Sequence, residues 1–534
     1  MGDGRTEERL YLVRLSGEVG IKSRRTRAQF QRRLARNLED ALASLDSPGD
    51  GGAGAGRAPG AGAGGRGGNG PDDRDGDHGS GGSGPGRGGG GGGIDLRWER
   101  IYARTAEPGA PAALARVFGV SSFSAIDAVV PANLEEIVRV GESLYHGRVR
   151  GRRYAVRARR SGEHAFRSKD IEIQLGAALN EGAEVDLDHP EITVRVEVRD
   201  DDAYLFADRI AGAGGLPVGT EGRAVALISG GYDSAVAAWL MLKRGVALDY
   251  VFCNLGGEAY ERSVVQVAKV LADDWSYGSR PRIDVVDFGP AVDAMRADVK
   301  QSYWQVVLKR LMYRTASRIA AERGAQAVVT GEALGQVSSQ TLANLRAIEP
   351  AAELPVFRPL LGFDKQEIIE RAREIGTAAL SEQVKEYCAL APGKPVTAAS
   401  VERVDEQEAR MDLSVIDEAV AGRKTLDLRA LTSTDLVAPY LFATEIPDDA
   451  VVFDCRTEAQ YRAWHLPGAE HRDEWDLLRR FKALDRDRTY VLYCAHGIQT
   501  AYIAEKMQRA GYEAYSFKGG LRGVMRWAEE REVA

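Results

Sequence analysis

The chain has 534 residues, a length that fits about three or four domains of ordinary size. Its apolar fraction of 44% is that of a folded protein, and no stretch reaches the ~18 uninterrupted apolar residues of a membrane-spanning helix. The opening segment, MGDGRTEERL, contains acidic residues and lacks the apolar core of a signal peptide. We therefore expect a cytoplasmic protein with no membrane partner.

Net charge and cysteine content limit the functions further. The net charge of −7 disfavours a nucleic-acid partner, but the segment from Arg148 to Lys169 carries nine Arg or Lys and one acid. This segment indicates either a local anionic partner such as RNA or a solvated charged face. None of the four cysteines forms a CxxC pair, so we expect no structural zinc site and no metal-ligating residues. In the cytoplasm, any cysteine pairing would be transient and catalytic.

The N-terminal third predicts two small α+β units. Alternation and helical spacing indicate a strand at Leu10–Leu15, a helix at Thr26–Ala43 and a strand at Ile94–Tyr102. The Gly-rich segment from Ser47 to Gly93 buries too little apolar surface to fold, so we predict a disordered insert within a domain spanning 1–103.

The second unit is expected at 104–209, followed by a linker at Gly212–Gly222. Its predicted helices and strands lie at Leu134–Leu144, Arg153–Ala158, Lys169–Asn180, Ile192–Val198 and Ala203–Ala207.

The next region alternates strands and helices, which is typical of a doubly wound parallel sheet. We place this domain at 215–400, with a long helix near Val299–Glu322 and a polar connector at 401–434. The tail, 435–534, predicts a smaller α/β domain. The expected strands of both domains are Ala224–Ile228, Leu248–Cys253, Arg282–Val286, Ala327–Thr330, Val451–Asp454 and Tyr490–Tyr493.

A glycine-containing turn, SGGYDS, follows the first of these strands and opens a helix at Ser234–Lys243. Backbone N–H groups and the positive helix end would meet a phosphate there, and Gly230 and Gly231 permit close approach. Ser229 and Ser234 add hydroxyl donors. The turn lacks the GxxxxGK[ST] spacing of a Walker A loop. A steric need for glycine is the alternative explanation of the turn.

The full hexapeptide resembles the PP-loop of ATP pyrophosphatases, which split ATP into AMP and pyrophosphate. That resemblance implies that Asp233 acts near the phosphates or their Mg²⁺.

Other segments resemble the tRNA 4-thiouridine synthetases, also called tRNA sulfurtransferases. Their ferredoxin-like segment is similar to Leu12–Leu34, and their RNA-binding THUMP domain resembles the unit with the basic segment. Further family signatures resemble Thr330–Thr341, Leu361–Ile368 and Glu386–Thr397. The resemblance covers nearly the whole chain except the Gly-rich insert, and implies a multidomain α/β and α+β protein.

The resemblance also implies a set of nucleotide-binding residues. Lys365 would stabilise charge at an adenylated intermediate; a surface lysine at a helix start is the alternative. Phe252 and Cys253 also fit simple packing at a strand end, and local alignment leaves Arg310 as an alternative to Lys309. The remaining members of the set are Leu227, Ile228, Gly331 and Gln340.

Cys494 opens a short loop, CAHGIQT, between a strand and the helix Ala501–Arg509. Loop N–H groups and a helix N-terminus would lower the pKa of its thiol and favour the nucleophilic thiolate, whereas a buried inert cysteine is the alternative. The tail resembles a rhodanese domain in its segment Phe453–Ala469, which implies a persulfide on Cys494. The loop has His496 and Gln499 where many rhodanese loops have arginine, so the sulfur donor stays open. Cys455 lies at an apolar strand end, and we expect it to be structural.

Cys388 completes the expected chemistry. In the resembling enzymes, a cysteine at this position forms a disulfide with the persulfide-bearing cysteine, whereas an unpaired surface cysteine is the alternative. The implied reaction adenylates a tRNA uridine, expected at position 8, and replaces its O4 with sulfur.

The implied partners are tRNA, a cysteine desulfurase or other persulfide donor, an external thiol reductant and a thiamine-pathway sulfur-carrier protein. ATP with Mg²⁺ would be the nucleotide. A small-metabolite PP-loop ligase and a noncatalytic RNA-binding protein remain alternatives.

Overall fold

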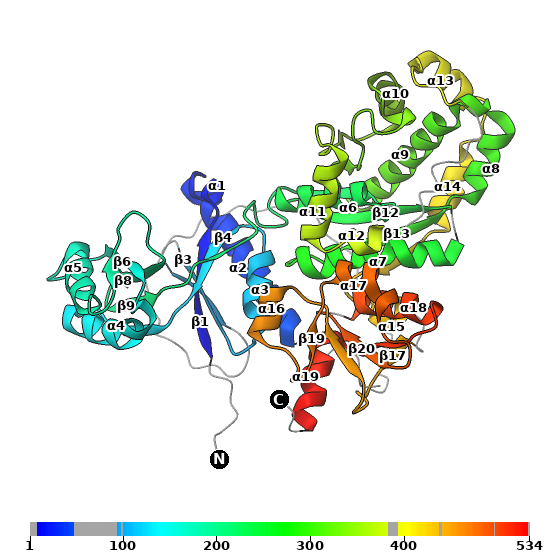
Figure 1. The fold of residues 1–534 in the computed structure, drawn as a ribbon. Coiled ribbons are helices and arrows are strands. Elements are labelled where there is room, and N and C mark those ends of the chain that lie inside the picture. Colours follow the sequence, from blue (N-terminus) through cyan, green and yellow to red (C-terminus); the bar gives the residue numbers. More distant parts are fainter. Residues whose placement is uncertain are drawn as a thin grey trace, which may run out of the picture.

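A computed structural model describes residues 8–46, 93–97, 100–255, 257–382, 394–436, 441–495 and 497–531. Strands of these residues form four sheets. Two small sheets lie at the left of Figure 1, the largest domain at the upper right, and the C-terminal domain beneath it. The insert expected at 47–93 falls outside the described residues apart from Gly93, so its predicted disorder stays a prediction.

The first sheet is antiparallel, with strand order β10-β4-β1-β3-β2. Helix α2 covers one face because Leu34, Leu38 and Leu42 repeat at helical spacing and are buried against the sheet. The elements are β1 (Arg9–Leu15), α1 (Gly17–Gly20), α2 (Arg24–Asp46), β2 (Gly93–Arg97), β3 (Arg100–Thr105), α3 (Ala110–Arg116), β4 (Val120–Ala125) and β10 (Ile210–Ala211).

Two expectations for this region are corrected. The single strand expected at Ile94–Tyr102 is a pair of antiparallel strands, β2 and β3, that meet at Arg97 and Arg100. The first unit does not end at residue 103, because β4 and β10 pair into its sheet. Strands β4 and β10 join the sheet through pairing with segments distant in sequence, which local sequence does not reveal.

The second sheet has strand order β5-β9-β8-β6-β7, and α4 and α5 pack on it. Strand β6 carries buried Tyr154 and Val156 on one face and three exposed or half-buried arginines, at 153, 157 and 159, on the other. A fourth, half-buried Arg160, falls on the face of Tyr154 and Val156. The elements are β5 (Ala128–Pro131), α4 (Leu134–Val149), β6 (Arg153–Ser161), α5 (Ser168–Ala178), β7 (Glu184–Val185), β8 (Ile192–Arg199) and β9 (Asp202–Phe206).

The largest domain is built on a six-stranded sheet of order β15-β14-β11-β12-β13-β16, parallel except for β16. Helices α6, α7 and α11 cover one face, and α8, α9, α10 and α14 cover the other. The chain leaves β11 toward β12 on one side and later returns to β14 on its other side. Ligands of such sheets bind at this switch point, beyond the carboxyl ends of the strands.

The elements of this domain differ from expectation in two places. The helix expected from Val299 begins at Trp304, after a 3₁₀ turn at Gln301–Tyr303. The segment 401–434 is not a free connector, because β16 pairs with β13 and Glu408 forms ion pairs with Arg310 and Arg314 of α9. Glu408, the buried acid of this segment, thus neutralises the buried Arg310.

The bounds of the strands and helices of this domain are as follows. They are β11 (Arg223–Leu227), α6 (Tyr232–Lys243), β12 (Ala247–Asn254), α7 (Gly257–Trp275), β13 (Arg282–Asp287), α8 (Gly289–Asp298), α9 (Trp304–Glu322), β14 (Val328–Val329), α10 (Leu342–Ile348), β15 (Val356–Phe357), α11 (Lys365–Ile375), α12 (Ala378–Ser381), α13 (Val401–Glu408), α14 (Ser414–Ala421) and β16 (Lys424–Asp427). Short 3₁₀ turns lie at Ser338–Gln340 and Glu349–Ala351.

The C-terminal sheet is wholly parallel, with strand order β17-β21-β20-β18-β19. The elements here are α15 (Ser433–Leu436), β17 (Phe442–Ala443), β18 (Val451–Asp454), α16 (Glu458–Ala463), β19 (Glu470–His471), α17 (Glu474–Arg480), a 3₁₀ turn (Phe481–Ala483), β20 (Thr489–Tyr493), α18 (Ile498–Arg509), β21 (Glu513–Phe517) and α19 (Gly520–Glu530). Among the described residues, none of the helices is both long and apolar enough to cross a membrane.

Specific contacts fix the domains against one another. Ala501 of α18 is buried in the core of the largest domain, and α18 contacts α12. Arg522 of α19 donates a hydrogen bond to the carbonyl of Ser44 in α2, and Arg429 pairs with Asp40 of the same helix. The C-terminal domain therefore touches both the largest domain and helix α2 of the N-terminal unit (Figure 1).

Phe118 joins the N-terminal unit to the largest domain. Its ring lies 5.4 Å from Trp239 and 5.5 Å from Trp275, measured between centroids, and it is 1% exposed. We predict that Phe118→Ala lowers the free energy of unfolding by about 3–5 kcal/mol, because it removes a buried ring and leaves a cavity. Urea unfolding measures this. Phe357→Ala, at a ring that is 47% exposed, should change stability by less than about 0.5 kcal/mol.

Candidate functional site

The turn after β11 is preorganised for an anion. Gly230 has φ +79°, a conformation that favours glycine, and α6 begins two residues later. The Ser234 hydroxyl accepts from the N–H of Ser229 at 3.2 Å and donates to the carbonyl of Gly231 at 3.1 Å. These bonds fix the turn at the N-terminus of α6, where the helix dipole favours negative charge.

A cavity of about 470 Å³ opens beside this turn, at the carboxyl ends of β11, β12 and β14. Its volume is in the range of small-molecule sites. Ten of the residues expected at a nucleotide site line it, together with Glu332 and Gln336. The ten are Leu227, Ile228, Ser229, Asp233, Ser234, Phe252, Cys253, Lys309, Gly331 and Gln340.

The structure decides between Lys309 and Arg310. Lys309 lines the cavity. Arg310 is 2% exposed and points to the other side of α9, where its guanidinium lies 2.6 Å from an Asp405 oxygen and 3.1 Å from a Glu408 oxygen. Arg310 as a cavity residue is therefore wrong, since neighbouring helix positions differ by about 100° in direction.

Asp233, in the first turn of α6, is tied to two side chains from distant segments. Lys365, at the start of α11, places its ammonium 2.9 and 3.2 Å from the two carboxylate oxygens of Asp233. Gln336 donates to the second of these oxygens at 2.9 Å. Lys365 does not line the cavity but pairs with Asp233, which does, so it is not an isolated surface lysine. Sequence reasoning missed Gln336, although it lies inside the segment Thr330–Thr341.

Gly331 is where the chain after β14 meets the turn of residues 229–234, called the phosphate turn below for its proposed role. A Cβ atom there would lie 2.6 Å from the Asp233 carbonyl carbon and 2.6 Å from the Ser234 nitrogen. Only glycine permits this approach. Nearby Cys253 is buried, and burial raises the pKa of its thiol to about 12, so it is a wall of the cavity and not a nucleophile.

Cys494 lies at the carboxyl end of β20 and is 2% exposed. Its sulfur accepts from the N–H of Gly497 at 3.2 Å and from the hydroxyl of Thr500 at 3.5 Å. Both donors belong to the loop and first turn leading into α18, which favours a negatively charged sulfur. His496 and the side chain of Gln499 lie outside the described residues, as does Cys388.

Cys455 occupies the matching position on the neighbouring strand. Asp454 of β18 pairs with Tyr493 of β20, so Cys455 and Cys494 follow at the same edge. Burial, with a smaller contribution from Cys494, raises the pKa of the Cys455 thiol well above its ordinary value. The Cys455 thiol therefore stays protonated at neutral pH.

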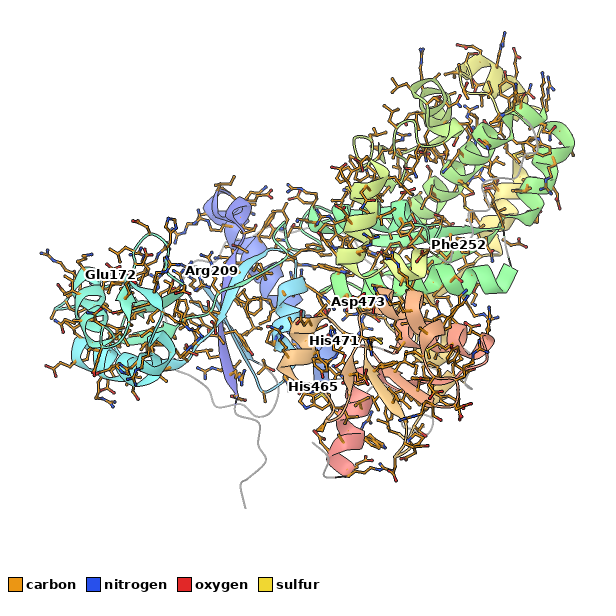
Figure 2. The ribbon with its side chains drawn as sticks, viewed as in Figure 1. Glu172, Arg209, Phe252, His465, His471 and Asp473 are labelled. Atoms are coloured by element: carbon orange, nitrogen blue, oxygen red, sulfur yellow. The ribbon has the colours of Figure 1, made fainter. Side chains whose placement is uncertain are left out.

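Arginines gather where the first and second sheets meet. The pKa of Arg14 is lowered to about 10, mainly by burial. The neighbouring Arg209, Arg100 and Arg195 lower it further, whereas Glu197 opposes the shift. The pKa of Arg195 is lowered as well, first by burial and then by three neighbouring arginines, Arg209 and, from strand β6, Arg159 and Arg157. Cations this close repel one another, so an anionic ligand on this surface would be stabilised. Figure 2 places Arg209 at this junction.

Comparisons with known proteins agree with this arrangement. The family model described as thiamine biosynthesis protein (ThiI) matches residues 219–413, the THUMP domain model matches 131–208, and the rhodanese-like domain model matches 440–526. A tRNA sulfurtransferase from Pyrobaculum aerophilum is 40% identical over 426 residues, which are 78% of this chain and 87% of that protein. The chain belongs to the tRNA sulfurtransferase family.

Other relatives extend the match. A tRNA sulfurtransferase from Yersinia enterocolitica is 37% identical over 428 residues, covering 78% of this chain and 89% of that protein. A solved 4-thiouridine synthetase–RNA complex with bound ATP superposes with a TM-score of 0.64 at 30% identity, covering 79% of this chain and 99% of that one. The expected fold class, with THUMP, PP-loop and rhodanese domains, is confirmed, and the chain is a sulfurtransferase enzyme.

The Gly331 approach generates a prediction. We expect Gly331→Ala to separate β14 from the phosphate turn, with a loss of about 1–3 kcal/mol of stability and weakened nucleotide binding. Calorimetric titration with ATP and thermal unfolding measure the two effects. Gly362→Ala is the matched control, because its Cβ would meet nothing within 4 Å. Unchanged ATP affinity in Gly331→Ala would show that the contact is unimportant.

A second prediction concerns pH and Glu474, beside Cys455 in the C-terminal domain. Burial, with a contribution from Asp473, raises the pKa of Glu474 to about 8, against about 4.3 in an unfolded chain. The folded state binds the carboxyl proton of Glu474 more tightly than the unfolded state does. The stabilisation of the folded state by this proton is therefore full below about pH 4 and is lost as the pH rises toward 8. The melting temperature of Glu474→Gln should therefore fall less than that of the wild type between pH 5 and 8. Parallel curves would contradict this assignment.

Proposed function

We propose that this enzyme uses ATP to activate a tRNA uridine, expected at position 8, and replaces its O4 with sulfur carried on Cys494. One observation carries the proposal: the helix that follows Cys494 is packed into the same domain that holds the phosphate turn. The uses of RNA and ATP are supported by the solved relative, whose title names both.

The cavity suits an adenine nucleotide. The amide oxygen of Gln340 is buried and, among the described residues, has no hydrogen-bond partner, so it can accept from an amine such as adenine N6. The phosphates would then lie on the turn from Ser229 to Ser234. Lys309 supplies a cation on the cavity wall. Leu227, Ile228 and Phe252 supply apolar walls for the base.

Activation would occur at the mouth of this cavity. The O4 of the uridine attacks the α-phosphate, and pyrophosphate leaves toward the turn and the start of α6. Lys365 stands where negative charge develops. Within the described residues, no three His, Cys, Asp or Glu side chains gather as a metal site. Mg²⁺ commonly binds through substrate phosphates and one or two carboxylates, a role that Asp233 fits.

Sulfur transfer follows in two balanced steps. The outer sulfur of the Cys494 persulfide attacks C4 and AMP leaves, which joins Cys494 to the uridine through a disulfide. The Cys388 thiolate then attacks the Cys494 sulfur, so that 4-thiouridine leaves as the thiolate and a Cys388–Cys494 disulfide forms. An external thiol reductant resets the pair. Ser381 ends α12, which contacts α18, and the chain from there to Cys388 can span at most about 25 Å.

The arginine-rich surface and the family membership indicate the remaining partners of the enzyme. The arginines at the junction of the N-terminal sheets would bind tRNA phosphates, and a cysteine desulfurase or other persulfide donor would load Cys494 in the cytoplasm.

Sulfur delivery to a thiamine-pathway carrier protein is a second candidate function, favoured by the matching family description. A thiamine requirement in a deletion strain, restored by the wild-type chain and not by Cys494→Ser, tests it.

Asp233 tests the ATP-dependent step. We predict that Asp233→Asn lowers 4-thiouridine formation by a factor of about 10² or more, because it removes charge at the phosphates. Near-ultraviolet absorbance of tRNA and release of pyrophosphate measure the effect. Asp293→Asn, an exposed carboxylate of α8, is the control and should behave as the wild type. Normal product from Asp233→Asn would overturn the role of this residue.

The cysteines test the sulfur path. Cys494→Ser should abolish product, whereas Cys455→Ala should retain the wild-type rate within about twofold, since its thiol stays protonated and plays no covalent part. Cys388→Ser should accumulate a tRNA joined to Cys494 by a disulfide, which a thiol reductant releases. Gel electrophoresis without reductant detects this species. Product from Cys494→Ser would place the sulfur carrier elsewhere.

A further inference from the structure

Glu332 is a buried carboxylate on the wall of the nucleotide cavity, three residues after β14. Its side chain is 1% exposed, and it lies beside Thr330, Gly331 and Lys309 in that wall. Burying a carboxylate costs several kcal/mol unless it is paired and hydrogen-bonded. The arrangement of its two oxygens shows how this cost is offset.

One oxygen of Glu332 is held by the scaffold. Oε2 accepts hydrogen bonds from the Tyr313 hydroxyl, from the Thr330 hydroxyl at 3.0 Å and from the Nε–H of Arg358 at 2.9 Å. These donors come from α9, from the end of β14 and from the segment after β15. Three bonds of different direction fix the carboxylate plane.

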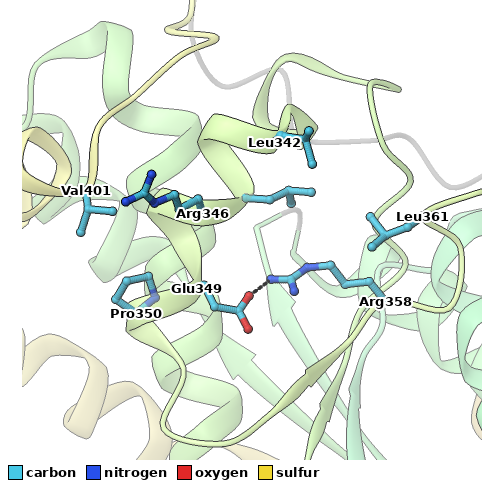
Figure 3. Close-up of a pocket in the computed structure, with 8 residues that line it drawn as sticks. Leu342, Arg346, Glu349, Pro350, Arg358, Leu361 and Val401 are labelled. Atoms are coloured by element: carbon cyan, nitrogen blue, oxygen red, sulfur yellow. Dashed lines mark hydrogen bonds and ion pairs between the residues drawn. The ribbon is translucent and has the colours of Figure 1, made fainter.

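Arg358 is itself held from the far side. Its guanidinium donates to the Tyr313 hydroxyl at 3.1 Å and pairs with Glu349 in an open pocket on the outer surface (Figure 3). Arg358 therefore reaches from that outer pocket to the wall of the nucleotide cavity. The carboxylate of Glu332 cannot rotate without breaking this whole set of bonds.

The other oxygen of Glu332 is left for the cavity. Within the described part of the chain, Oε1 accepts no hydrogen bond, and the Lys309 ammonium lies 3.7 Å from it. Burial raises the pKa of Glu332, but Lys309, Tyr313 and Arg358 together outweigh burial and hold it below its usual value. The carboxylate is thus charged, immobile and directed at a lysine.

We propose that Glu332 is the positioning residue for Lys309, and that it restrains the lysine ammonium at the place where the nucleotide phosphates or ribose bind. A lysine has a long flexible side chain and loses rotamer freedom when it binds an anion. A fixed carboxylate removes part of that freedom before the nucleotide arrives. The inference rests on the proposed function in that Lys309 contacts ATP.

A double-mutant cycle on the full chain tests this, with the dissociation constant for ATP as the readout. Lys309→Met and Glu332→Gln should each weaken ATP binding by about tenfold or more, and the double variant should bind no more weakly than Lys309→Met alone. Full additivity of the two losses, or wild-type affinity in Glu332→Gln, would overturn the proposal. Glu349→Gln, which removes the exposed partner of Arg358, should stay within about twofold.

A second cycle covers the case in which Glu332→Gln does not fold, as judged by its thermal transition. Tyr313→Phe removes one bond to Oε2 and leaves every charge in place, so it should weaken ATP binding by about threefold in the wild type and not in Lys309→Met. Equal losses in both backgrounds would overturn the proposal.

The affinity cycles do not depend on sulfur transfer. Coupled variants together with absent 4-thiouridine formation would support the inference and overturn the proposed function. A wild type that does not bind ATP would overturn both.

Discussion

The packing of α18 into the largest domain is the contact on which the chemistry depends. Ala501, in the first turn of that helix, is fully buried in a core formed by α6, α7 and α11. The same helix begins just after Cys494 and supplies donors to its sulfur. Cys494 and the turn of residues 229–234 are therefore parts of one packed unit.

The two proposed sites share one local geometry on two separate sheets. In each, a parallel strand ends, a short turn exposes backbone N–H groups, and a helix begins with its positive end toward the ligand. At the phosphate turn this arrangement favours an oxygen anion, and at Cys494 it favours a sulfur anion. Gly230 allows the left-handed backbone of the first turn and Gly331 allows β14 to approach it, whereas Gly497 donates its N–H directly to the Cys494 sulfur.

Much of this could be predicted from the sequence because the decisive elements are local. The strand–turn–helix around Ser229 to Ser234 and the loop opened by Cys494 are contiguous segments with strong periodicity. Features that depend on the pairing of strands could not be predicted from local sequence. Examples are the β2–β3 pair and the pairing of β16 with β13 in the largest sheet. The choice between Lys309 and Arg310 needed the facing of α9, since apolar residues flank both. Glu332 gave no signal because sequence does not show that a carboxylate is buried.

The anchoring of α2 has a consequence for how the chain tolerates its Gly-rich insert. Near the C-terminal end of that helix, Ser44 is held by Arg522 and Asp40 by Arg429, while Gly93 on the far side of the insert pairs with Arg104. Both attachment points are thus secured independently of what connects them. The entropy of closing a loop grows only with the logarithm of its length, about 0.6 kcal/mol for each doubling. Homologous chains could therefore lengthen or shorten this segment with little effect on folding, which makes the site suitable for inserting a tag or a foreign domain.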